Sequence, residues 1–188
     1  MENDVERVLI SREQIQHRVR ELAHQITVDH TPTDGSEPPE VTIIPILTGA
    51  IIFCCDLIRC IPMQMKIGLM TVSSYPGTSL RSQGVSVISK QIGDVHGRHV
   101  VLLDDILDSG ETIRAVAPMI RDLGAASVRV CVLLRKDRPE ARSTPCDYVG
   151  FDIPDEFVVG YGLDYDNYYR NLPEVVTLKK EAIERRKV

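Results

Sequence analysis

The chain has 188 residues, 43% hydrophobic and 26% charged, which is enough length and apolar content for a domain with a buried core. Its formal net charge of -5 lacks the basic field that general nucleic-acid or membrane-surface binding requires, so we expect neither partner. Five cysteines without a CxxC pair indicate free thiols, and no apolar run reaches the ~18 residues of a membrane span, so we expect a cytoplasmic protein.

The first predicted element is an amphipathic helix that begins after Ser11. This serine can cap the helix, and Gln14 completes a capping-box pattern three residues later. Apolar residues then recur at helical spacing: Ile15, Val19, Leu22 and Ile26. Residues 29–40 (DHTPTDGSEPPE) are rich in Pro, Gly and Asp and predict a loop. We take residues 1–40 as an N-terminal helix and loop within a single domain that spans residues 1–188.

Apolar strands and helical segments alternate through the middle of the chain. Strands are predicted at residues 41–47, 65–73, 99–105 and 128–134, and helices at residues 50–59 and 111–123. Gly124 is a natural end for the second of these helices. The alternation predicts an α/β fold in which helices flank a central, mostly parallel sheet.

The remaining segments are more polar or more broken. Residues 75–90 (YPGTSLRSQGVSVISK) are too long for a tight turn and too polar for a core, and they predict a loop of the kind that often forms a lid. Short strands are predicted at residues 148–151 and 157–161, separated by Pro154. We expect residues from about 147 to 188 to form a small hood over one edge of the sheet.

The stretch VVLLDDILDSGETI (residues 100–113) carries the strongest chemical signal. Asp104 and Asp105 end an apolar strand, and Asp108 follows three residues later. Like charges side by side at the end of a buried strand are costly unless a ligand uses them. In an open α/β sheet, ligands bind beyond the carboxyl ends of the strands, which is where these acids are expected to lie.

The turn after these acids, residues 108–112 (DSGET), is suited to a phosphate. It offers backbone N–H groups, two hydroxyls and the positive end of a helix dipole. It lacks the GxxxxGK[ST] spacing of a nucleotide P-loop and the GxGxxG of a dinucleotide site. The acids beside it suit sugar hydroxyls and Mg²⁺, so a phosphorylated sugar is the predicted ligand. The alternative is that Asp108 or Ser109 merely caps the helix.

Several segments resemble one known family. LLDDILDSGET is similar to the phosphoribosyl-pyrophosphate (PRPP) signature of type I phosphoribosyltransferases. LTGA (47–50) resembles the pyrophosphate loop of the hypoxanthine-guanine branch, and SSY (73–75) resembles the start of its lid. LLRKDR (133–138) and residues 149–175 resemble its purine-reading and C-terminal blocks. The resemblance covers about residues 40–176 and implies a type I phosphoribosyltransferase fold with a small hood subdomain.

This resemblance implies an activity in purine salvage. The enzyme would transfer the 5-phosphoribosyl group of PRPP to hypoxanthine or guanine and give IMP or GMP plus pyrophosphate, with Mg²⁺ as cofactor. It also implies a homodimer or homotetramer. Two positions depart from the family pattern, because Thr48 and Glu111 stand where many members have lysine. An unusual, strained or cis peptide is expected between Leu47 and Thr48.

The resemblance also implies roles for individual residues. Asp108 would be catalytic, as the acceptor of the purine N7 proton. The residues implied to bind PRPP are Leu47, Thr48, Gly49, Asp104, Asp105, Asp108, Ser109, Gly110, Glu111, Thr112 and Arg170. Those implied to bind the purine are Ile106, Lys136, Phe157, Val158 and Asp164, with Ser74 and Tyr75 in the lid and Asp104, Asp105 and Asp164 at Mg²⁺.

Plainer interpretations stay open for some of these residues. A lysine after an apolar strand, as at Lys136, is usually a surface residue, and so is an arginine near a C-terminus, such as Arg170. Residues 157–161 (FVVGY) could simply be a buried strand, and the acids could be a solvated strand end. Two functional alternatives also remain: a PRPP-sensing regulator that binds RNA or DNA, which the acidic charge disfavours, and a transferase that acts on xanthine.

Overall fold

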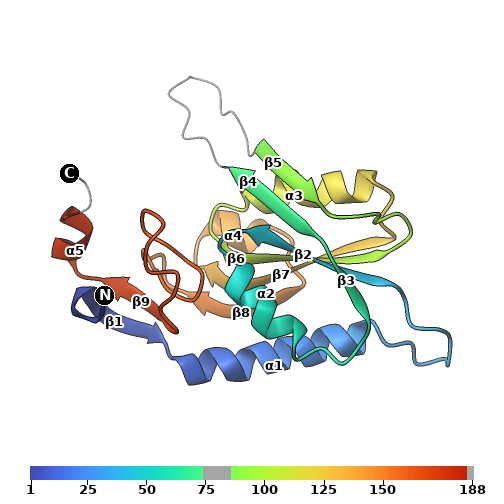
Figure 1. Cartoon of the computed structure of the whole chain (residues 1–188), viewed down its shortest axis with the longest axis horizontal. Helices are drawn as coiled ribbons and strands as arrows, with labels where there is room; N and C mark the ends of the chain where they lie inside the picture. Colours follow the sequence, from blue (N-terminus) through green and yellow to red (C-terminus); the bar gives the residue numbers. More distant parts are fainter. Residues whose placement is uncertain (74–85, 186–188) are drawn as a thin grey trace.

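A computed structural model describes residues 1–73 and 86–185 of the chain (Figure 1). In this part, seven strands form a central sheet with the order β5-β4-β2-β6-β7-β8, and β3 also pairs with β2. The strands are β2 (Val41–Leu47), β3 (Met65–Ile67), β4 (Leu69–Ser73), β5 (Ser86–Gln91), β6 (His99–Leu107), β7 (Ser127–Lys136) and β8 (Tyr148–Ile153). All pairs are parallel except β4 with β5, so the predicted mostly parallel sheet is confirmed.

Helices cover both faces of this sheet (Figure 1). Helices α1 (Arg12–Asp29) and α2 (Ile51–Ile58) pack on one face, and α3 (Glu111–Asp122) packs on the other. The predicted capping box at the start of α1 is confirmed, because Ser11 and Gln14 each accept a hydrogen bond from the other's backbone N–H. Within the described residues, no helix is long and apolar enough to cross a membrane.

Burial on both faces explains why the central strands are continuously apolar. Along β6, Val101 and Leu103 point into the core shared with α1 and α2, whereas Val100 and Leu102 point into the core shared with α3. All four are fully buried. This double burial fixes β6 at the centre of the sheet, with its carboxyl end next to those of β2 and β7.

Two predictions about the edge of the sheet are wrong. The single strand predicted at residues 65–73 is divided at Gly68, whose N–H donates to the carbonyl of Ile43. A side chain at Gly68 would meet the backbone of Ile92 at 2.8 Å, so this close approach favours glycine and a break in the strand. The predicted loop at residues 75–90 instead contributes β5 from Ser86 onward, because an antiparallel partner compensates for a polar sequence.

The hood is built from both ends of the chain (Figure 1). Strand β1 (Val5–Ile10) pairs antiparallel with β9 (Val175–Leu178), and neither strand was predicted. The short helices α4 (Pro139–Ser143) and α5 (Lys180–Glu184) were also missed, as was a 3-10 turn at Glu2–Asp4. The strand predicted at residues 157–161 is wrong, because only an isolated bridge joins Val159 to Val176 and the next three residues have positive φ.

A close contact seats the hood on the loop that follows β2. A Cβ built at Gly162 would lie 2.1 Å from the carbonyl oxygen of Gly49. Beside this contact, the Tyr161 hydroxyl donates a hydrogen bond of 2.7 Å to Asp56 on α2. Only a residue without a side chain allows the two backbones to approach so closely, so Gly162 sets the position of the hood over the sheet.

Replacing Gly162 by alanine tests this contact against a matched control. Gly97 also has a positive φ, of 69°, but a side chain there would meet nothing within 4 Å. Gly97→Ala should therefore cost only the left-handed strain of about 1 kcal/mol. Gly162→Ala adds the clash with Gly49 and should lower the free energy of unfolding in urea by roughly 2–4 kcal/mol. Equal losses in the two variants would contradict the close contact.

Candidate active site

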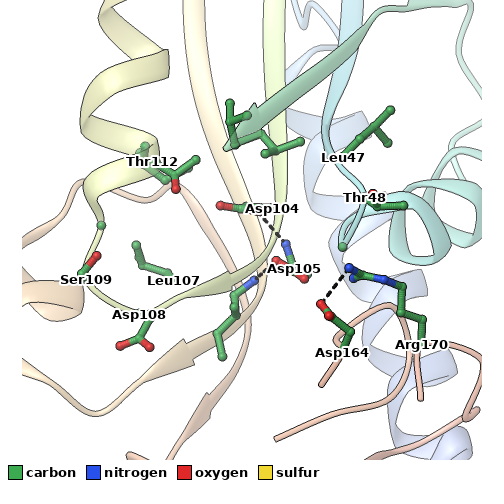
Figure 2. A pocket seen from close by; sticks show the side chains of 16 residues that line it. Leu47, Thr48, Asp104, Asp105, Leu107, Asp108, Ser109, Thr112, Asp164 and Arg170 are labelled. Atoms are coloured by element: carbon green, nitrogen blue, oxygen red, sulfur yellow. Dashed lines mark hydrogen bonds and ion pairs between the residues drawn. The ribbon is translucent and has the colours of Figure 1, made fainter. Parts of the chain in front are cut away.

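A cavity of about 390 Å³ opens at the carboxyl ends of the central strands, where the sequence predicted a site (Figure 2). It lies between the loop after β2, the end of β6 and its following turn, and the hood. The lining residues are Ile46, Leu47, Thr48, Gly49, Val72, Asp104, Asp105, Ile106, Leu107, Asp108, Ser109, Gly110, Thr112, Ile113, Asp164 and Arg170. Polar groups on several separate segments therefore converge on one hollow.

Two adjacent carboxylates form the floor of this cavity. Asp104 is only 7% exposed, and one of its oxygens accepts the backbone N–H of Asp105 at 3.1 Å. Asp105 accepts the N–H of Ile106 at 2.8 Å (Figure 2). Burial, and next the charge of Asp105, raise the pKa of Asp104 well above its usual range, and burial also raises the pKa of Asp105. A ligand with hydroxyls or a cation would relieve this buried acidic pair.

The turn from Asp108 to Gly110 forms one wall. Strand β6 runs to Leu107, beyond the predicted end at Asp105, so fewer residues are left for the turn than the sequence predicted. Gly110 is the N-cap of α3, with a φ of 76°, and no side chain caps the helix there. The interpretation of Asp108 as a cap is therefore not supported, whereas the Ser109 hydroxyl accepts a long hydrogen bond of 3.4 Å from the N–H of Glu111, the first residue of α3. Ser109, Gly110, Thr112 and Ile113 line the cavity around the start of α3, which is where an anion site is expected.

Arg114 supports this turn and was missed by the sequence analysis. Its guanidinium donates to the carbonyl of Ser109 and to the hydroxyl of Thr144, both at 2.6 Å. A Cβ at Gly110 would lie 2.0 Å from the same hydroxyl, so the turn is packed tightly onto Thr144. The only signal in the sequence was the position of Arg114 four residues after Gly110, one helical turn into α3.

The loop after β2 forms the opposite wall. The peptide between Leu47 and Thr48 is cis, as the family resemblance implied. Gly49 lies directly against the acidic pair, because a Cβ there would come within 1.8 Å of an Asp105 carboxylate oxygen. Glycine is therefore required for the loop to approach the end of β6.

Asp164 and Arg170 approach the cavity from the hood and bind each other. Their ion pair is 2.7 Å long (Figure 2). A second Arg170 nitrogen donates to the carbonyl of Gly162 at 2.6 Å, and Asp164 accepts the N–H of Asn167 at 2.8 Å. The plain interpretation of Arg170 as a free surface residue is wrong, because these contacts hold it over the cavity with its side chain only 24% exposed.

Asp108 belongs to a four-charge cluster formed with Lys136, Arg138 and Asp155. One of its oxygens lies 3.0 Å from the Lys136 ammonium, and the other accepts from Arg138. Asp155 pairs with Lys136 at 3.3 Å and with Arg138 at 3.4 Å. Burial acts to raise the pKa of Asp108, but the hydrogen bonds from Lys136 and Arg138 outweigh it, and the pKa is lowered. Arg138 and Asp155 had no role in the sequence analysis.

Most of the predicted site residues line this one cavity, but four do not. Lys136 does not line the cavity but pairs with Asp108, which does, and its side chain is only 12% exposed, so it is not the surface residue of the plain interpretation. Glu111 begins α3, Val158 is buried in the core, and Phe157 is half exposed against Tyr165. Ser74 and Tyr75 lie outside the described residues, so their predicted place in a lid stays a prediction.

The donor set fits Mg²⁺ that arrives with a phosphorylated substrate. Among the described residues, no three acidic, histidine or cysteine side chains gather closely enough to form a metal cage on their own. Mg²⁺ usually keeps several waters and takes one or two carboxylates together with substrate phosphates. The buried pair Asp104 and Asp105 matches that pattern, whereas Asp164 is already engaged by Arg170.

Comparisons with known proteins agree with this geometry. The sequence matches the family described as phosphoribosyl transferase domain over residues 11–166. It is 43% identical over 176 residues to a hypoxanthine-guanine phosphoribosyltransferase of Mycobacterium tuberculosis, covering 93% of this chain and 87% of that protein. It is 39% identical to one from Streptococcus pneumoniae, covering 97% and 98%. The fold matches a crystal structure of a hypoxanthine phosphoribosyltransferase from Staphylococcus aureus with a TM-score of 0.87 and 36% identity, over 96% and 95% of the two chains.

The buried acidic pair generates a prediction about stability and pH. Because the pKa of Asp104 is raised on folding, the folded state loses stability as the pH rises from the unfolded value of about 3.9 through the folded one. Asp104→Asn removes this charge. It should stabilise the ligand-free protein by about 1 kcal/mol at pH 7.5, a rise of roughly 2–4 °C in the unfolding midpoint, and the gain should shrink towards pH 4.

Thermal unfolding in EDTA between pH 4 and pH 8 measures this effect. Glu37→Gln, in the exposed loop before β2, is the control and should move the midpoint by less than about 1 °C at every pH. An unfolding midpoint for Asp104→Asn below that of the wild type at pH 7.5 would contradict the conclusion that the buried acidic pair destabilises the ligand-free fold.

Proposed function

This chain belongs to the phosphoribosyltransferase family, in its hypoxanthine-guanine branch and with the type I fold, and from that premise we propose how it acts. It is an enzyme of purine salvage that transfers the 5-phosphoribosyl group of PRPP to hypoxanthine or guanine, with IMP or GMP and pyrophosphate as products. The observation that carries this proposal is the cavity that joins a buried acidic pair to a phosphate-binding turn.

The sugar phosphate occupies the end of β6 and the turn after it. The 5-phosphate accepts hydrogen bonds from the backbone N–H groups of the turn and from the hydroxyls of Ser109 and Thr112, at the positive end of α3. The ribose hydroxyls face Asp104 and Asp105. Hydroxyl donors match carboxylates that have lost their contact with water, which explains why acids stand beside a phosphate site. Glu111 lies outside this cavity, which reduces its repulsion of the phosphate.

Pyrophosphate leaves from the opposite side of the cavity. Leu47, Thr48 and Gly49 surround it with backbone groups, so threonine can replace the usual lysine at this position. Arg170 contributes a planar guanidinium, which suits phosphate oxygens. Mg²⁺, when bound beside Asp104 and Asp105, would neutralise the charge that develops on the leaving group.

The purine lies beyond Asp108. Lys136 donates a hydrogen bond to its 6-oxo group. An amino group at that position would not accept this hydrogen bond. Phe157 stacks on the ring, Val158 meets its edge through the backbone, and Ile106 flanks it. A ring nitrogen bonds to C1 of the ribose while the bond from C1 to pyrophosphate breaks, and the N7 proton passes towards Asp108. Ser74 and Tyr75 would close over the reacting groups and exclude water.

The surroundings of the enzyme are part of the proposal. Residues 1–188 act as one catalytic domain in the cytoplasm, where reduced thiols persist, in line with five cysteines that are all unpaired. We expect a homodimer or homotetramer, which light scattering on the purified protein would determine. The alternative substrate xanthine differs from hypoxanthine only at the 2-position, and a direct assay distinguishes the two.

The proposed reaction predicts a definite pattern of substrates. With PRPP and Mg²⁺, hypoxanthine and guanine should give IMP and GMP, whereas adenine and uracil should give no nucleotide. Chelation of the metal by EDTA should reduce turnover at least about 100-fold, because the charge on pyrophosphate is then unbalanced. Chromatography of the products checks both points. PRPP binding without nucleotide from any base would favour a regulator over an enzyme, and a dominant xanthine signal would change the substrate but not the fold.

Two substitutions test the purine end. Asp108→Asn and Lys136→Ala should fold normally and lose most turnover, by roughly 100-fold or more in kcat, since each removes a group that contacts the reacting base. Circular dichroism checks the fold and a steady-state assay checks the rate. Unaltered activity in both variants would refute the assignment of the purine site.

A further inference from the structure

The four-charge cluster is drawn from the ends of three neighbouring parallel strands. The register pairs Leu107 of β6 with Arg135 of β7, so Asp108 and Lys136 follow side by side at the same edge. Lys136 is in turn paired with Ile153 of β8, and Asp155 lies two residues beyond it. The strand order therefore brings these charges together, and the cluster is a fixed feature of the sheet edge rather than a chance surface contact.

Arg138 reaches this cluster from an ordered backbone. It is the N-cap of α4, in an extended conformation with φ -130° and ψ 145°, and Pro139 occupies the first turn of that helix. Its backbone N–H donates to the carbonyl of Lys136 at 2.9 Å. From this position, its Nη1 donates to Asp108 while its Nε faces Asp155 at 3.4 Å.

The two carboxylate oxygens of Asp108 have different partners, and the inference rests on this difference. Oδ2 lies 3.0 Å from the Lys136 ammonium, whereas Oδ1 accepts from Arg138. In the proposed reaction, Lys136 must turn to the 6-oxo group of the purine. That movement frees Oδ2 to face the N7 proton, but it also removes a cation from Asp108. Arg138 is the neighbouring cation that stays on Oδ1.

We propose that Arg138 is a positioning residue that holds the Asp108 carboxylate in place when Lys136 moves to the purine, with Asp155 anchoring Arg138. This inference rests on the proposed function and adds a residue to it. The cluster contributes little to stability, because Asp108 and Arg138 are each 40% exposed and ion pairs of that exposure are weak. Its loss should therefore appear in the kinetics of the purine and not in unfolding.

The charges that face Asp108 determine how pH enters the test. Lys136 and Arg138 lower the pKa of Asp108, Asp155 balances both cations, and Asp104 and Asp105 precede it on β6. Removing Arg138 takes away one lowering contact, so Asp108 becomes protonated at a higher pH. With PRPP saturating, the acid limb of kcat/KM for hypoxanthine reports this group in the enzyme that has bound PRPP but not yet the purine, and it should move to higher pH.

Arg138→Gln in the full-length protein is the main test, with PRPP and Mg²⁺ saturating. The kcat/KM for hypoxanthine should fall roughly five- to tenfold and its acid limb should move up, while KM for PRPP changes less than about twofold. Arg138→Lys should recover part of the loss. Arg142→Gln is the matched control, because Arg142 forms ion pairs with Asp137 and Asp152 away from the cavity, and it should behave as wild type.

Asp155→Asn provides a second route if Arg138→Gln fails to fold. It removes a partner that Arg138 shares with Lys136, leaves Asp108 itself unchanged, and should give a smaller loss of kcat/KM for hypoxanthine without an upward shift of the acid limb. The proposal is overturned if Arg138→Gln matches Arg142→Gln, or if hypoxanthine and PRPP kinetics fall equally with an unmoved acid limb. Wild type that makes no nucleotide from hypoxanthine or guanine would instead refute the proposed function, before any variant is compared.

Discussion

The buried pair of carboxylates at the end of β6 is the constraint on which the site depends. Asp104 and Asp105 stand where a fully buried strand reaches the ligand cavity, and burial raises the pKa of both. Such a pair destabilises the ligand-free protein. The protein tolerates it because the hydrophobic cores on both faces of β6 supply enough stability. Gly49 then allows the opposite loop to approach Asp105, so the two sides of the cavity meet at this pair.

Charge is arranged differently at the two ends of the cavity. Around the acidic pair, the described residues leave room for hydroxyls and a cation. At the proposed purine end, Asp108 already has Lys136 and Arg138 as partners, which lower its pKa and favour the ionised form. One strand and the turn after it therefore present acids in two electrostatic states, and this difference is what the proposed division between sugar binding and proton transfer requires.

The hood joins distant parts of the chain to this site. Its small sheet pairs β1 with β9, so both ends of the chain hold it in place. Gly162 rests on Gly49 at a distance that only glycine permits, and the same segment carries Asp164 and Arg170 over the cavity. The hood therefore holds Asp164 and Arg170 over the cavity through the backbone contact at Gly162 and through their own ion pair.

The sequence by itself determined the strands β2, β6, β7 and β8, the capping box of α1 and the position of the turn after β6, because hydrophobic period, caps and strand-to-helix turns are local properties. Its resemblance to a family located most of the lining residues. Only the tertiary structure decided the β1–β9 pairing, the strand β5 and the partners of Asp108. These depend on contacts between residues far apart in the chain: Arg138 reaches Asp108 across the register of neighbouring strands, and no local pattern encodes that distance.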